Sequence, residues 1–97
     1  NTPGGVIVLE MSQNDYNMTE IANIIESNGA KLLSLFIGVH TNSTLIELIL
    51  KINKTDLDSI LHTFIRYNYA IKATFGEEED LEDLKDNYDS LMNYLNI

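Results

Sequence analysis

The sequence contains no cysteine and no tryptophan, and it has only one proline. Without cysteine there are no disulfides, no thiolate metal sites and no cysteine nucleophiles. Basic residues are also few, with 6 Lys and Arg against 15 Asp and Glu, and this balance disfavours binding to nucleic-acid phosphates. The apolar runs, such as LLSLFIGV, are far shorter than the roughly 20 residues of a membrane-spanning helix, so we expect no membrane segment.

What is present is a short chain with enough apolar residues for one folded domain. Its 97 residues are 44% hydrophobic, which is typical of a single domain with a modest core. The chain begins at Asn1 rather than Met, so we expect further sequence upstream. No signal-peptide pattern is visible, so we expect a cytoplasmic location. The net charge of −9 is concentrated in residues 77–97, where eight acids stand against Lys85 alone.

Hydrophobic periodicity predicts two successive strand–helix–strand units. The strands are expected at residues 6–11, 32–39, 44–52 and 70–75, and the helices at residues 18–27 and 57–65. Right-handed crossovers then give an α+β, ferredoxin-like βαββαβ fold, a four-stranded antiparallel sheet with both helices on one face. The two halves also align at an offset of forty residues, which places Asn28 on Asn68.

Polar residues mark the expected ends of the helices. Asn17 followed by Glu20 is typical of a capping box, and Asn28-Gly29 is typical of a helix C-terminus. Thr55 followed by Asp58 predicts a similar cap for the second helix. Three sequences also match the N-glycosylation pattern, and we interpret them as turn and cap residues instead; they are Asn17, Asn42 and Asn53.

An acidic segment follows the predicted fold, and its apolar residues recur at helical spacing. We therefore divide the chain into a domain at residues 1–76 and a C-terminal amphipathic helix at residues 77–97, which packs on the domain or on a partner subunit. In the last strand, Ile71, Ala73 and Phe75 are expected to share one face. The sheet face away from the helices is expected to carry cross-strand ion pairs among Glu10, Glu47, Lys51 and Lys72. The alternative is that these residues line a polar pocket or an interface.

The stretch NDYNMTEIANIIESNGAKLLSL, residues 14–35, resembles an ACT domain. Asp15 matches the acid in the loop after the first strand, and Gly29 matches the small residue after the first helix. The resemblance covers about residues 5–75. In more detail, the chain and its closing DLKDNYDSLMNYLNI resemble the C-terminal ACT-like region of bacterial (Bacteroidetes-type) CBS-domain proteins.

This resemblance implies a non-enzymatic regulatory module that senses an amino acid or a nucleotide-like effector, works as a homodimer and follows an upstream CBS pair. The ligand would bind near the loop after the first strand, at residues Asn14, Asp15, Tyr16, Asn17, Met18 and Ser34. Amino-acid-binding ACT domains typically carry Pro-Gly after the loop acid, where this chain has Tyr16, Asn17 and Met18. The alternative is a pure oligomerisation or assembly module that binds no small ligand.

The sequence offers little for catalysis, and we expect no catalytic residue, no metal site and no cofactor. His40 and His62 are the only histidines, and no further metal ligands cluster with either. Ser59 precedes His62 by three residues, but no oxyanion motif accompanies the pair. An acylphosphatase, which shares this fold, would need an arginine in the loop after the first strand, and that loop has no basic residue.

Overall fold

Strands and helices follow one another in the predicted order. A computed structural model describes residues 4–76, and the helix expected at residues 77–97 lies outside the described residues. A short 3-10 turn, η1 (Gln13–Asp15), precedes the first helix. The other elements are β1 (Gly5–Ser12), α1 (Met18–Ser27), β2 (Leu32–Val39), β3 (Leu45–Ile52), α2 (Asp58–Arg66) and β4 (Ala70–Phe75). Neither of these two helices is long and apolar enough to cross a membrane.

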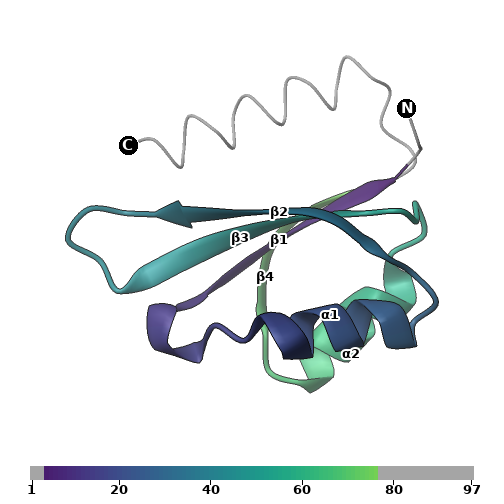
Figure 1. Cartoon of the computed structure of the whole chain (residues 1–97), viewed down its shortest axis with the longest axis horizontal. Coiled ribbons are helices and arrows are strands. Elements are labelled where there is room, and N and C mark those ends of the chain that lie inside the picture. Colours follow the sequence, from purple (N-terminus) through teal and green to yellow (C-terminus); the bar gives the residue numbers. More distant parts are fainter. Residues whose placement is uncertain (1–3, 77–97) are drawn as a thin grey trace, which may run out of the picture.

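The four strands form one antiparallel sheet in the order β2-β3-β1-β4. Both helices lie on the same face of this sheet (Figure 1). The predicted α+β class, with four antiparallel strands and two helices, is therefore confirmed for the described residues, and the arrangement is compatible with a ferredoxin-like fold. Because β1 and β3 are the central strands, they carry most of the packing on both faces.

The main hydrophobic core lies between the helices and the sheet. The central strands contribute alternate residues that are almost fully buried, namely Ile7, Leu9, Ile46, Leu48, Leu50 and Ile52. Ile21, Ile24 and Ile25 pack on them from α1, and Ile60 and Phe64 pack on them from α2. Each such side chain contributes about 1.5–3 kcal/mol through its removal from water, so this layer holds the helices in place.

A second, smaller cluster lies on the sheet face opposite the helices. It consists of Val6, Val8 and Ile49, with Ala73 and Phe75 packed against them. Val8 is fully buried and Ile49 is 3% exposed. The central strands are therefore apolar on both faces, which is why their sequences form nearly continuous apolar runs.

A β-bulge at Lys72 decides which residues of β4 face each cluster. Pairing of β4 with β1 shifts at this residue. Ile71, before the bulge, packs in the main core, whereas Ala73 and Phe75, after it, pack in the second cluster. The prediction that these three residues share one face is therefore wrong, because the extra residue reverses the alternation of the strand.

The predicted N-terminal cap is confirmed for α1 but is wrong for α2. The Asn17 side chain accepts a hydrogen bond from the Glu20 backbone N–H at 3.0 Å, which satisfies one of the unpaired donors of the first turn. At α2, the Thr55 cap does not form, and the residue that precedes the helix is Leu57. The carboxylate of Asp56 accepts from the backbone of Asp58 at 3.2 Å instead.

Both helices end on a residue in the left-handed conformation. After α1 this residue is Gly29, at φ 77°, and after α2 it is Asn68, at φ 67°. The backbone N–H groups of Ala30 and Tyr69 then bond back to Ile25 and Phe64, which closes the same type of C-terminal cap twice. The structural offset between the two halves is thus one residue shorter than the forty of the sequence alignment.

Replacing Gly29 with alanine is expected to lower the free energy of unfolding by about 1 kcal/mol. A Cβ there would meet no atom within 4 Å, so the loss comes from backbone strain alone. Asn68→Gly is the matched control, because it removes a Cβ from the same conformation and is expected to leave stability unchanged or higher. Urea denaturation measures both effects, and a Gly29→Ala variant as stable as the parent would contradict the strain.

Candidate functional site

The turn after β1 brings five of the six predicted ligand residues to one corner of the molecule. Asn14 and Asp15 lie exposed in η1, and Asn17 and Met18 begin α1 with exposed side chains. Tyr16 is half-buried and packs against the main core, and its hydroxyl donates to the Met18 sulfur at 3.5 Å. The corner is therefore a mainly polar surface that also exposes Met18, and it is anchored by one aromatic ring.

Ser34, the sixth predicted residue, lies away from this corner within the same chain. It is exposed in β2 and pairs with Lys51, which in turn pairs with Val6 near the start of β1. The corner follows Ser12, at the other end of β1. The sheet therefore separates Ser34 from the corner by several residues of strand, or roughly 20 Å at about 3.3 Å per residue.

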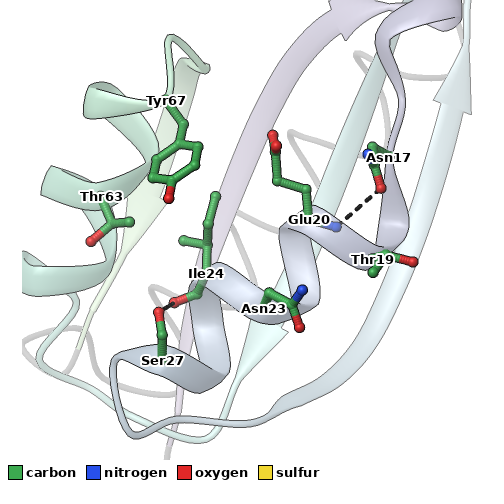
Figure 2. Close-up of a pocket in the computed structure, with 8 residues that line it drawn as sticks. All are labelled: Asn17, Thr19, Glu20, Asn23, Ile24, Ser27, Thr63 and Tyr67. Carbon is green, nitrogen blue, oxygen red and sulfur yellow. Dashed lines mark hydrogen bonds between the residues drawn. The ribbon is translucent and has the colours of Figure 1, made fainter.

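A depression of about 450 Å³ runs between α1 and α2 beside this corner (Figure 2). Its polar lining comes from Asn17, Thr19, Asn23 and Ser27 on the α1 side and from Thr63 and Tyr67 on the α2 side. Apart from Asn17, these residues were not singled out by the sequence analysis. The sequence pattern that could have predicted this lining is the four-residue spacing of Thr19, Asn23 and Ser27, which aligns short polar side chains along one helix face.

A second depression, of about 410 Å³, lies between the corner and the start of β4. Three acidic residues contribute to its lining, Glu10, Asp15 and Glu20, and none of its lining residues is basic. The Glu10 carboxylate itself pairs with Lys72. Glu20 and Tyr67 line both depressions, so the two are neighbours. The electrostatic character of the corner is acidic, which disfavours anionic ligands and favours ligands that carry an ammonium group.

Glu20 has a structural partner at the edge of the second depression. The hydroxyl of Tyr69 donates a 2.6 Å hydrogen bond to Glu20 Oε1, and the Tyr69 ring lies edge-on to Phe64 with ring centroids 5.1 Å apart. Burial, followed by the hydrogen bond to Glu20 and the charge of Glu20, raises the pKa of Tyr69 above its usual range. Tyr69 therefore remains protonated and holds the Glu20 carboxylate against the start of β4.

A group of charged side chains lies on the opposite sheet face. Lys72 Nζ lies 3.2 Å from Glu10 Oε2 and 3.1 Å from Glu47 Oε1, and His40 Nε2 lies 3.4 Å from the same Glu47 oxygen. The predicted ion pairs of Lys72 with Glu10 and Glu47 are thus confirmed, whereas Lys51 forms no ion pair with a described residue.

Lys72 lies between two carboxylates that the sheet register places opposite each other. Glu10 and Glu47 lie directly opposite each other on β1 and β3, and the Glu47 side chain is only 1% exposed. Two facing carboxylates destabilise a sheet unless a cation lies between them. The bulge places Lys72 there, although Glu47 Oε2 is still buried without a hydrogen-bond donor.

In the part of the chain that the structure describes, neither histidine belongs to a metal-binding group. Within residues 4–76, no three His, Asp or Glu side chains are grouped so as to hold a metal ion. His62 is exposed on α2, and the structure shows no hydrogen bond between it and Ser59. His40 contacts a carboxylate that Lys72 already neutralises.

Replacing Lys72 with methionine is expected to lower the free energy of unfolding by about 2 to 3 kcal/mol, because it leaves the buried Glu47 facing Glu10. This is less than for a fully buried pair, since the Lys72 side chain is 30% exposed. Adding Glu47→Gln to that variant is expected to restore part of the stability. Lys31→Met, at an exposed position, is the control.

Chemical denaturation of the parent, of the single variants Lys72→Met and Glu47→Gln and of the double variant gives the coupling energy between positions 47 and 72. If the two substitutions were simply additive, or if Lys72→Met matched Lys31→Met, the ion pair would have no structural role.

No protein-family model matches this chain, and searches of curated proteins and of solved structures found no match either.

Proposed function

We propose that residues 5–75 form an ACT-like regulatory module that works as a homodimer and senses a small molecule at the corner after β1. The resemblance in residues 14–35 supplies the class of module. The observation that carries the proposal is the apolar surface of the edge strand β2. The upstream CBS pair implied by the resemblance would be the part of the full-length protein that this module regulates.

Strand β2 has the features of a strand that pairs with another chain. It lies at the edge of the sheet, where β3 is its only neighbour among the described strands. Four of its eight residues expose large apolar side chains, namely Leu33, Phe36, Ile37 and Val39. Leu45 of β3 is also exposed and adds to this surface. A long apolar edge strand is an aggregation hazard unless it is paired or covered. Antiparallel pairing of two β2 strands about a two-fold axis would cover it and give a continuous eight-stranded sheet.

The acidic corner supports a ligand with an ammonium group, such as an amino acid, over a phosphate-bearing nucleotide. Asp15 is exposed and has no ion pair with a described residue, so it is the residue best placed to accept such a group. Asn17 and Tyr67 add polar groups at the neighbouring depression.

A second candidate is an assembly module that binds no small ligand. The hydrogen bonds of the corner favour it, because Asn17 already caps α1, Glu20 already accepts from Tyr69, and Tyr16 already contacts Met18. The one buried, unpaired side-chain oxygen of the described residues belongs to Glu47, on the opposite face. Both candidates share the homodimer and differ only in the ligand.

The double variant Ile37→Lys, Val39→Lys is expected to convert the full chain from a dimer to a monomer, because lysines facing each other across the two-fold axis repel and disfavour edge pairing. Ile65→Lys is the control, since Ile65 is also exposed, at 58%, but lies on α2. Multi-angle light scattering measures the mass of each protein. A parent chain that is monomeric at tens of micromolar would contradict the homodimer.

A thermal-shift screen of the full chain against amino acids, amines and nucleotides separates the two candidates. A ligand present at 100 times its Kd stabilises the folded state by about 2.7 kcal/mol, which raises Tm measurably. We expect a rise with an ammonium-bearing ligand and its loss in Asp15→Asn, while Glu26→Gln, an exposed acid elsewhere on α1, retains it. A dimer with no rise for any compound would contradict sensing at this corner and favour the assembly module.

A further inference from the structure

The sheet face opposite the helices lacks a covering layer among the described elements (Figure 1). Val6, Val8 and Ile49 form its apolar centre, and all three are buried, with exposed fractions of 8%, 0% and 3%. Residues of a sheet are buried on one face only when a second layer packs on that face. Since α1 and α2 lie on the other face, these residues require a further layer.

The buried carboxylate of Glu47 adds to this requirement. It lies on the same face as Ile49, two residues before it in β3, and its side chain is 1% exposed. Lys72 compensates part of its charge from the rim, and His40 Nε2 lies 3.4 Å from the same carboxylate. Phe36, which pairs with Ile49 and is 51% exposed, extends the apolar surface towards β2.

We propose that residues 77–97 of the same chain form this layer, as an amphipathic helix laid across the face. The path of the chain places the segment at the edge of that face. Phe75, the last residue of β4, pairs with Val6 and packs in the apolar cluster, and only Gly76 separates it from the segment. The segment therefore starts beside the surface that it covers.

The sequence of the segment fits this surface in length and pattern. Its apolar residues fall at helical spacing and would form one stripe; they are Leu81, Leu84, Tyr88, Leu91, Met92 and Leu95. A helix over residues 81–95 would be about 22 Å long, and strands of eight residues are about 26 Å long. The stripe thus spans most of the sheet.

The chain connection favours this segment over that of a second copy, and the charge of the segment is compatible with the surface. Its eight acids lie outside the stripe, where they remain in water or approach Lys51 at the rim of the face. A segment tethered through a single residue has a high effective concentration at its own domain, so docking within the chain precedes docking of a partner's segment. In this arrangement the edge of β2 stays available for the pairing of two chains in the proposed homodimer.

Paramagnetic relaxation in the full chain tests the proposal. The chain has no cysteine, so Ser90→Cys carries a nitroxide label at a single position in the segment. We expect loss of the NMR signals of Val8, Ile49 and Ala73, on the face opposite the helices, and retention of the signals of His62, on α2. Loss of signals on α1 or α2 instead, or no loss at all, would overturn the docking.

A mixed sample separates the chain's own segment from a partner's. An isotope-labelled chain without nitroxide is combined with an unlabelled chain that carries it, so only contacts between chains cause signal loss. We expect the Val8 and Ile49 signals to persist in this sample. Their loss would show that the segment of a second copy covers the face, and would overturn the proposal.

A stability measurement provides an independent readout. Leu84→Gln with Leu91→Gln removes two apolar groups from the stripe, and we expect Tm to fall by about 10 °C. Asn87→Gln with Asn93→Gln changes two residues of the same segment outside the stripe, and we expect no change in Tm. Equal Tm values for the two double variants would show that the stripe contacts nothing, and would also overturn the proposal.

Discussion

The central strands β1 and β3 bury apolar side chains on both of their faces, and the rest of the structure follows from this constraint. On one face, α1 and α2 supply the opposing apolar layer. On the other face, Val6, Val8 and Ile49 form a separate cluster that neither helix reaches. A sheet of this kind is stable only between two layers, so the domain and whatever covers its second face fold as one unit.

The charges on the second face depend on the same two strands. The antiparallel register brings Glu10 and Glu47 into direct opposition, and their mutual repulsion destabilises the pairing of β1 with β3. The bulge in β4 adds one residue and turns Lys72 towards both carboxylates. A local irregularity of one strand thus compensates an unfavourable pair on two others. One buried carboxylate oxygen, Glu47 Oε2, still has no hydrogen-bond donor.

Local signals in the sequence predicted the elements well, because they act over a few residues. Asn17 with Glu20 located the start of α1, and Gly29 located its end. The bulge at Lys72 was not predicted, since it depends on how β4 pairs with β1 and no turn residue marks it. The cap of α2 was misplaced because Thr55 and Asp56 are both suitable cap residues, and only the path of the chain selects between them.

The candidate site was predicted only in part for a similar reason. The corner after β1 is contiguous in sequence, so its five residues were found together, whereas the depression between α1 and α2 joins Asn23 to Thr63 and requires the packing of two helices. Ser34 was grouped with the corner by resemblance, and the register of β2 places it near the other end of the sheet. Residues that are contiguous in the sequence were therefore predicted together, whereas residues that only the packing of helices and strands brings near the loop were not.

The central claim is that the sheet is buried on both faces. The accessibility of methyl groups to a dissolved paramagnetic agent tests this most directly, when measured by NMR on the full chain. The account predicts that the methyl groups of Val8 and Ile49 are as well shielded as those of Ile60 in the main core, while Val39, at 61% exposure, is strongly broadened. Broadening of Val8 and Ile49 to the same extent as Val39 would contradict it.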